Sequence, residues 1–349
     1  MLKNLVFAVL LVLFFGCKKS TNSPVIIETK PPVVTPVLSD NFVKGADISW
    51  LTEMEKANVK FYNSAGKEQE LIQLLKDRGM NTIRLRVWVN PDGGWNNTED
   101  VLAKSLRAKA LGMRILIDFH YSDFWADPGK QNKPKAWQNQ NIEQLKQSVY
   151  DHTAAVLTVL KFNGITPEWV QVGNETNNGM LWEEGRASKS MKNFADLIQS
   201  GYNAVKAVSS TSKVIVHISN GFNNTLFRWM FDGLKANGAK WDVIGMSLYP
   251  TSSNWQTLNT QCLANMNDMV SRYNTEVMVC EVGMDVSATT ACKAFLSDII
   301  LKTNSVSGKK GLGVLYWEPQ AYNSWKGYNL GAVDTSGKPT VAMDAFLIK

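Results

Sequence analysis

Short apolar runs alternate with longer amphipathic stretches along most of this chain. The short runs are rich in β-branched residues and predict buried strands. The stretches between them carry apolar residues every three or four positions, which is typical of helices. The predicted strands cover residues 43–48, 82–87, 114–119, 169–172, 213–218, 243–248, 276–282 and 312–316. Helical spacing is clearest over residues 67–79, 98–111, 142–162 and 187–208.

About eight strand–helix units in about 300 residues is the number found in a closed parallel barrel. We therefore predict an α/β fold, a single (β/α)8 TIM barrel, over residues 41–349. The alternative for alternating strands and helices is an open, doubly wound sheet. Because no glycine-rich phosphate-binding loop follows the first predicted strand, the barrel is the better interpretation.

The N-terminus does not share this alternation. Lys3 precedes an apolar run from Leu5 to Phe15, which is too short to span a membrane and is typical of a secretory signal peptide over residues 1–16. The next residues, Gly16 and Cys17, complete a Leu-Phe-Phe-Gly-Cys segment that resembles the lipobox of bacterial lipoproteins. Cys17 would then be the lipidated first residue of the mature chain. A plain signal peptide cleaved nearby is the alternative.

Residues 17–40 would form a lipidated N-terminus and a flexible linker, since 18–40 are rich in Pro, Ser and Thr. A lipid would tether the protein to a membrane and leave the barrel in water. This predicts an exported, membrane-anchored lipoprotein of a Gram-negative bacterium, at the cell surface or in the periplasm. Lys18 and Lys19 do not match the acidic export signal of some surface lipoproteins, so the side of the membrane stays open.

Composition narrows the classes of partner. The formal charge is +6, but the basic residues are scattered and no basic run is interleaved with aromatics, so we expect no nucleic-acid partner. The 12 tryptophans offer flat apolar faces that suit stacking against sugar rings. The cysteines lack the spacing of a zinc site. Cys280 is predicted to be a buried apolar residue, and Cys262 and Cys292 could form a disulfide in an oxidising compartment.

Two of the predicted strands end in a glutamate. Glu175 follows Trp-Val-Gln-Val-Gly-Asn at 169–174, and Glu281 follows Glu-Val-Met-Val-Cys at 276–280. Active sites of parallel barrels are built at the carboxyl ends of several different strands. Two carboxyl groups there, in a chain with many tryptophans, indicate cleavage of a glycosidic bond.

Further polar and aromatic residues lie at the other predicted strand ends. Because alternate strand residues point to one side, Arg84 and Arg86 share a face, and two buried arginines should meet carboxylates. Each signal is weak alone, and their joint placement is what points to a site. The remaining candidates are Trp88 after the second strand, Asp118 and His120 at the third, Asn174 before the first glutamate, His217 on the fifth, Tyr249 after the sixth and Trp317 after the eighth.

Several segments together resemble glycoside hydrolase family 53, the endo-β-1,4-galactanases of clan A, over nearly all of residues 41–349. They are Gly-Ala-Asp-Ile-Ser (45–49), Thr-Ile-Arg-Leu-Arg-Val-Trp-Val-Asn-Pro (82–91), Ile-Asp-Phe-His-Tyr-Ser-Asp-Phe-Trp-Ala-Asp-Pro (117–128), Gln-Val-Gly-Asn-Glu (171–175) and Tyr-Trp-Glu-Pro (316–319). The resemblance implies that Glu175 is the acid/base and Glu281 the nucleophile. It also implies galactan or arabinogalactan side chains of pectin as substrate, with retention of configuration.

This chemistry assigns expected roles to the other candidates. Glu281 must be ionised, and we expect Arg86 and Tyr249 to hold it so. Asn174 is placed to bind the sugar 2-hydroxyl, and Trp317 would form an apolar floor. Trp88, Trp125 and Trp182 are either neighbouring sugar-binding residues or core residues.

The resemblance implies no required cofactor. Some bacterial members hold calcium in the loops after the seventh and eighth strands, but the stretch after Trp317 carries few carboxylates, which speaks against calcium here. We expect a monomer. The strand-end chemistry also fits another clan A endo-glycanase, such as a β-mannanase or an endoglucanase. A third hypothesis is a non-catalytic glycan-binding surface lipoprotein, although glycan binding alone does not need two glutamates at strand ends.

Overall fold

The computed structural model describes residue 16 and residues 37–349. The predicted signal peptide apart from Gly16, the lipidated Cys17 and the linker as far as residue 36 lie outside the described residues. The compact unit begins at Val37, slightly before the predicted start of the domain at residue 41. Leu38 is already buried, and its backbone N–H donates to the carbonyl of Lys349 at 3.2 Å.

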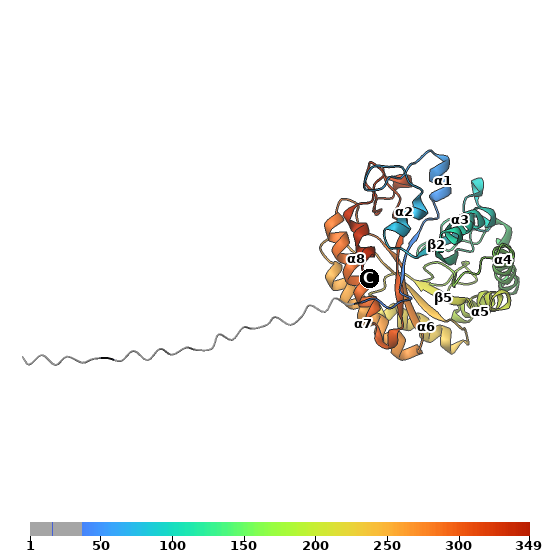
Figure 1. The fold of residues 1–349 in the computed structure, drawn as a ribbon. Coiled ribbons are helices and arrows are strands. Elements are labelled where there is room, and N and C mark those ends of the chain that lie inside the picture. Colours follow the sequence, from blue (N-terminus) through green and yellow to red (C-terminus); the bar gives the residue numbers. More distant parts are fainter. Residues whose placement is uncertain (1–15, 17–36) are drawn as a thin grey trace, which may run out of the picture. The chain divides into compact units, whose positions relative to one another are not determined.

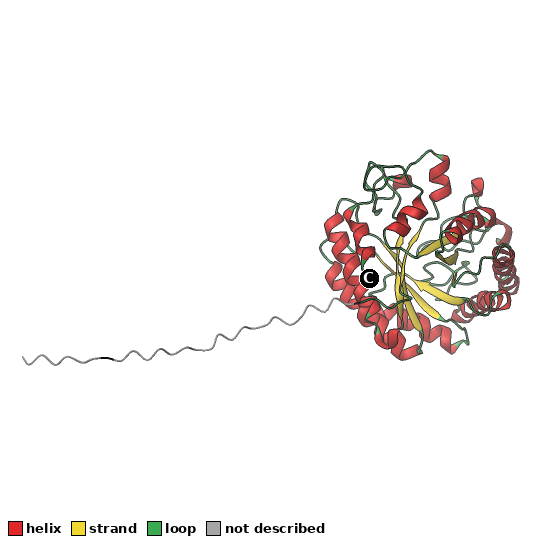
Figure 2. Cartoon of the chain, viewed as in Figure 1, coloured by secondary structure: helices red, strands yellow, loops and turns green. Residues whose placement is uncertain are grey.

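Within residues 37–349, parallel strands form one closed barrel in which each strand pairs with the next and β8 pairs with β1 (Figures 1 and 2). The predicted TIM barrel is therefore confirmed. The strands are β1 (Val43–Asp47), β2 (Thr82–Val87), β3 (Arg114–Phe119), β4 (Trp169–Val172), β5 (Lys213–Ile218), β6 (Val243–Leu248), β7 (Glu276–Val282) and β8 (Gly311–Trp317).

Helices surround this barrel on its outer side (Figure 2). They are α1 (Leu51–Lys56), α2 (Leu71–Asp77), α3 (Thr98–Ala110), α4 (Ile142–Phe162), α5 (Met191–Val208), α6 (Asn224–Ala236), α7 (Trp255–Tyr273) and α8 (Thr289–Asn304). Short 3-10 helices cover Asp92–Gly94, Lys135–Trp137, Ser307–Lys309, Trp325–Gly327 and Val341–Leu347.

Caps explain where two of the predicted helices begin. Asn141 and Gln144 form a capping box at the start of α4, which satisfies N–H groups that have no partner within the helix. The helix predicted from residue 187 begins later, at Met191. There the Ser190 side chain accepts from the backbone N–H of Asn193 and stops the helix from extending further back.

The interior of the barrel has an apolar half and a charged half. Alternate residues near the strand starts form an apolar cluster in which Gly245 lets the strands pack closely, since a Cβ there would lie 2.8 Å from Ile215 Cγ2. Farther along the strands, the inward positions are polar, and Arg84 and Arg86 on β2 are among them. The cluster consists of Val43, Leu116, Trp169, Ile215, Val243, Met278, Cys280 and Leu315.

The described cysteines are buried and unpaired, so the disulfide considered for Cys262 and Cys292 is not formed. Cys280 lies in the apolar cluster, as predicted. No helix among residues 37–349 is both long enough and apolar enough to cross a membrane.

Candidate active site

Glu175 and Glu281 line one cavity of about 320 Å³ at the carboxyl ends of the strands. Glu281 lies near the end of β7, and Glu175 lies in the turn that follows β4. That turn contains Gly173 at φ 85° and Glu175 itself at φ 43°, the left-handed region that non-glycine residues seldom adopt. Asn174, Tyr249, Trp125 and Trp317 line the same cavity, so six of the candidates predicted from sequence converge here.

Glu281 is held by a cation and a hydroxyl group. Arg84 Nη2 lies 2.8 Å from its Oε1, and the Tyr249 hydroxyl donates to its Oε2 at 2.8 Å. The contact expected for Tyr249 is present, but the cation is Arg84 and not Arg86. Arg86 lies two residues nearer the mouth of the barrel, and its guanidinium pairs instead with Glu318, which follows β8, at 2.6 Å.

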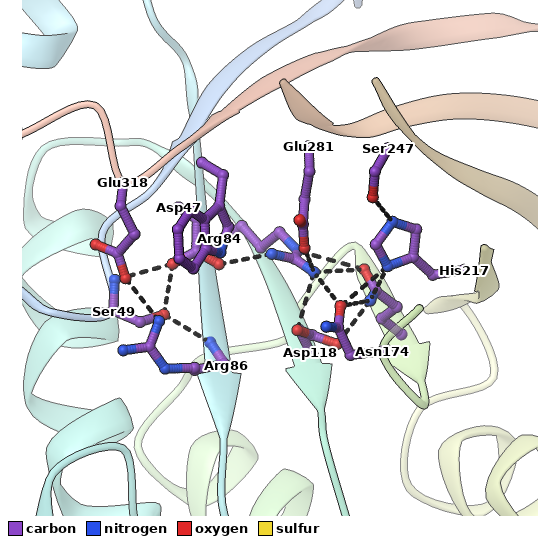
Figure 3. Close-up of polar contacts among 12 residues, drawn as sticks. Asp47, Ser49, Arg84, Arg86, Asp118, Asn174, His217, Ser247, Glu281 and Glu318 are labelled. Atoms are coloured by element: carbon purple, nitrogen blue, oxygen red, sulfur yellow. Dashed lines mark hydrogen bonds and ion pairs between the residues drawn. The ribbon is translucent and has the colours of Figure 1, made fainter. Parts of the chain in front are cut away.

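Arg84 is the centre of a buried ionic network (Figure 3). Its side chain is 1% exposed, and its guanidinium contacts Asp47 at 2.8 Å and Asp118 at 2.9 Å as well as Glu281. It also donates to Gln171 Oε1 at 3.2 Å and to Asn174 Oδ1 at 3.0 Å. One buried cation thus fixes carboxylates and amides from several strands, which holds the groups around the cavity in one geometry.

Burial raises the pKa of both cavity glutamates. The charge of Glu175 also raises the pKa of Glu281, so the two carboxyl groups titrate together. Arg84 and the Tyr249 hydroxyl stabilise the anion of Glu281 by direct contact. Glu175 makes no ion pair within the described residues, and its pKa is lowered only by the Ser247 hydroxyl and the more distant charge of Arg84. These contacts favour the first negative charge on Glu281 and the remaining proton on Glu175.

His217 joins β4 and the turn that carries Glu175 to β6 through hydrogen bonds. Its Nδ1 accepts from Gln171 Nε2 at 2.8 Å and from the backbone N–H of Glu175 at 3.4 Å, which favours the proton on Nε2. Nε2 then donates to the Ser247 hydroxyl at 2.8 Å. Burial lowers the pKa of His217 well below its usual value, so the ring is neutral.

Asp118 and His120 lie beneath the cavity wall. Asp118 accepts from Gln171 at 2.7 Å and is bound to Arg84, while His120 Nε2 lies 3.0 Å from Asp118. The backbone N–H of Ala126 donates to His120 Nδ1 at 3.1 Å, so the ring proton is on Nε2 and points to the carboxylate. Neither side chain lines the cavity, nor does His217, and direct contact of these three with a substrate stays a prediction.

The family model for Glycosyl hydrolase family 53 matches residues 43–346. The chain belongs to this family. It is 35% identical over 298 residues to a probable arabinogalactan endo-beta-1,4-galactanase A of Neosartorya fischeri, covering 79% of this chain and 83% of that protein. It is 32% identical over 311 residues to the endo-beta-1,4-galactanase of Bacillus subtilis, covering 81% of this chain and 71% of that protein.

A solved structure also resembles this family 53 chain over most of its length. It comes from a study of two fungal beta-1,4-galactanases and matches with a TM-score of 0.82 at 29% identity. The match covers 89% of this chain and 99% of the fungal chain. Family, fold and glycosidase class, which the sequence motifs implied, are thus confirmed.

A second cavity of about 880 Å³ lies beside the first in this family 53 barrel. Trp125 lines both cavities, and Trp50, Trp88, Trp95 and Phe124 line the second. Trp182 lines neither, but it lines a third cavity of about 420 Å³ that shares Asp123, Phe124 and Lys135 with the second. Arg186 lies over its ring at 3.7 Å. A groove of about 720 Å³ beside Lys213 and Glu276 lies at the opposite, amino ends of the strands and contains neither glutamate.

Several residues of this site were not predicted from the sequence. Arg84 was expected only to meet carboxylates. Ser247 lies in the predicted strand 243–248 and Glu318 in the segment 316–319, and the sequence predicted a role for neither. Glu318 is fully buried, and burial raises its pKa to about 7. The strand alternation of β2 was the available signal for Arg84. Among the described residues, no group of three or more His, Cys, Asp and Glu side chains has the arrangement of a metal site.

Proposed function

We propose that this chain is an endo-acting β-1,4-galactanase that cleaves galactan or arabinogalactan with retention of configuration. The observation that carries the proposal is the pair of carboxyl groups in one cavity, Glu281 buried and Glu175 partly buried, of which only Glu281 contacts a cation directly. The family assignment and the names of the relatives support galactan as the substrate class.

The contacts of the two glutamates suit a double displacement. Glu281, ionised beside Arg84, attacks the anomeric carbon, while Glu175 donates its proton to the departing sugar oxygen. The resulting ester on Glu281 carries no charge, so one cause that kept Glu175 protonated is removed. Glu175 then acts as the base that takes a proton from the attacking water, and the glycosyl ester is hydrolysed.

Neighbouring groups suit the binding of the sugar at the point of cleavage. Asn174 Oδ1 is occupied by Arg84, and its Nδ2 donates to the Ala126 carbonyl at 2.8 Å, which leaves the other amide hydrogen for a sugar hydroxyl. Trp317 lines the cavity beside both glutamates and offers an apolar surface for the ring. The second cavity shares Trp125 with the first and offers room for further sugar units, which supports endo action.

Product analysis tests the substrate. Purified protein is incubated separately with galactan, mannan and cellulose, and the products are separated by chromatography. We expect short galactose oligosaccharides from galactan alone. Products from mannan or cellulose but not galactan would assign a different clan A activity, and binding without products from any polymer would indicate a glycan-binding protein.

We further propose that the enzyme acts as a monomer without a required cofactor, exported and held at a membrane through lipidated Cys17. The N-terminal sequence supports the anchor, because an apolar run is followed by Gly16 and Cys17. Expression of the full chain and of Cys17→Ser in a Gram-negative host, followed by membrane fractionation, tests it. We expect the wild type in the membrane fraction and the variant outside it; equal distribution of the two would contradict lipid anchoring.

A further inference from the structure

The two arginines of β2 point into the barrel from the same face but serve different partners (Figure 3). Arg84 binds carboxylates, including Glu281. Arg86 makes one ion pair, from Nη1 to Glu318 at 2.6 Å, and its side chain is also 1% exposed. Within the described part of the chain, Nε and Nη2 of Arg86 have no hydrogen-bond partner. Its buried charge is therefore not satisfied by hydrogen bonds alone.

Tryptophan rings surround the rest of this guanidinium. Its central carbon lies 4.1 Å from the ring centroid of Trp125, 5.1 Å from that of Trp88 and 5.4 Å from that of Trp50. A cation over an indole face is attracted by the ring, and the attraction is strongest where water is excluded. Arg86 therefore holds three indoles from different loops around one point.

Glu318 ties the same tryptophans to the barrel from the other side. It directly follows Trp317, has a left-handed backbone at φ 49°, and its backbone N–H donates to the Asp47 carbonyl at 3.0 Å. Its carboxylate accepts from the backbone N–H of Trp50 at 3.1 Å as well as from Arg86. Glu318 thus joins the end of β8 to the loop after β1, and each of these carries a tryptophan.

These tryptophans form the wall that the two cavities share. Trp125 lines both cavities and packs edge-on against Trp50, Trp88 and Trp317 at centroid distances of 5.3 to 5.6 Å. Trp317 lines the cavity of the glutamates, while Trp50 and Trp88 line the other. We define the tryptophan wall as Trp50, Trp88, Trp125 and Trp317.

We propose that Arg86 and Glu318 are positioning residues that hold the tryptophan wall in the orientation that binds sugar rings in both cavities. This inference rests on the proposed function for its substrate. The pair acts through the indoles and does not contact the reacting atoms. Its effect therefore falls on chains long enough to occupy both cavities, more than on the bond-breaking step itself.

Arg86→Lys is the principal test variant, because it keeps the charge for Glu318 but loses the flat guanidinium against the indoles. Arg114→Lys is the matched control, since Arg114 also joins a carboxylate, Glu168 at 2.6 Å, to an indole, Trp169 at 4.4 Å, but at the amino end of β3. The double variant Arg86→Gln/Glu318→Gln removes both charges together, so that neither is left buried alone.

Steady-state kinetics are measured on galactan and on an aryl galactoside short enough to occupy the glutamate cavity alone. For Arg86→Lys and the double variant, we expect kcat/KM on galactan to fall at least about tenfold through KM, because small misplacements of binding groups cost that much or more. kcat on the short substrate should change less than about threefold. The pH profiles of the Arg86 variants should match that of the wild type. Arg114→Lys should match the wild type in both its kinetics and its pH profile.

Near-ultraviolet circular dichroism of the unliganded proteins supplies a readout that needs no substrate. We expect the tryptophan bands to change in both Arg86 variants and not in Arg107→Lys, in which the replaced guanidinium pairs with Glu55 and Glu70. Unchanged bands, or an equal loss of kcat on short and long substrates with a shifted pH profile, would overturn the proposal. If the wild type itself does not cleave galactan, the proposed function fails, and the circular dichroism alone decides the positioning role.

Discussion

Arg84 Nη2 lies 2.8 Å from Glu281 Oε1, although Arg84 belongs to β2 and Glu281 to β7, with β1 and β8 between these two strands. The same guanidinium holds Asp47 and Asp118. Arg84 therefore serves both the proposed catalysis and the stability of the fold. The cation that keeps the proposed nucleophile ionised is also the one that compensates two structural carboxylates.

Removal of Arg84 should cost stability as well as activity. In Arg84→Met, three buried carboxylates lose their shared cation, which is expected to destabilise the fold by about 3–5 kcal/mol. Urea unfolding followed by tryptophan fluorescence measures this. The control is Arg228→Met, since Arg228 pairs with Asp268 on the exposed surface and is expected to change the free energy of unfolding by less than about 1 kcal/mol. Equal stability of the two variants would contradict the role given to Arg84.

Ser247→Ala should shift the basic limb of the pH–activity profile. The Ser247 hydroxyl lowers the pKa of Glu175 by stabilising its anion, so its loss raises that pKa. Activity that depends on protonated Glu175 is lost as the pH rises through this pKa, and the basic limb therefore moves to higher pH. A profile of kcat/KM against pH checks it, and a shift to lower pH would show that Ser247 does not donate to Glu175.

Tyr249→Phe should shift the acidic limb of the pH–activity profile. The Tyr249 hydroxyl donates to Glu281 Oε2 at 2.8 Å and lowers the pKa of that carboxyl, so its removal raises the pKa. The acidic limb, where Glu281 gains its proton, should move to higher pH while the basic limb moves less. The same pH profiles measure this. An unchanged acidic limb would mean that Arg84 alone sets the ionisation of Glu281.

Trp317→Ala should weaken substrate binding more than it weakens the fold. Trp317 lines the cavity beside both glutamates and is only partly buried. Loss of an aromatic surface against a sugar ring is expected to lower kcat/KM by about tenfold or more. Kinetics on galactan, with thermal unfolding as the control, check this. A large fall in melting temperature with normal kinetics would make Trp317 a structural residue.

The strand pattern was sufficient to predict the barrel and to place both glutamates at its mouth, because period-two alternation and strand ends are local features of sequence. Which arginine reaches Glu281 was not predictable. Alternation puts Arg84 and Arg86 on one face, but the partner depends on how far along β2 each lies and on which strand end faces it. Arg86 meets Glu318 only because β8 closes the barrel against β1.

Sequence spacing also failed to distinguish the tryptophans. Trp125 and Trp182 both stand in loops after predicted strands, yet Trp125 lines the cavity of the two glutamates and Trp182 lines a separate cavity. Long loops bring residues together through tertiary contacts that no periodic pattern encodes. The role of Glu318 could not be predicted for the same reason, since its partners Trp50 and Arg86 lie more than two hundred positions away in the sequence.

The central claim is that Glu281 forms the glycosyl ester and that Glu175 supplies and then removes the proton. Its most direct test is mass spectrometry of Glu175→Gln mixed with an aryl galactooligosaccharide that carries a good leaving group. That leaving group departs with little need of an acid, whereas water attack lacks its base, so an adduct should accumulate. We predict a sugar adduct on the peptide that contains Glu281. An adduct on another residue, or full turnover without any adduct, would contradict the assignment.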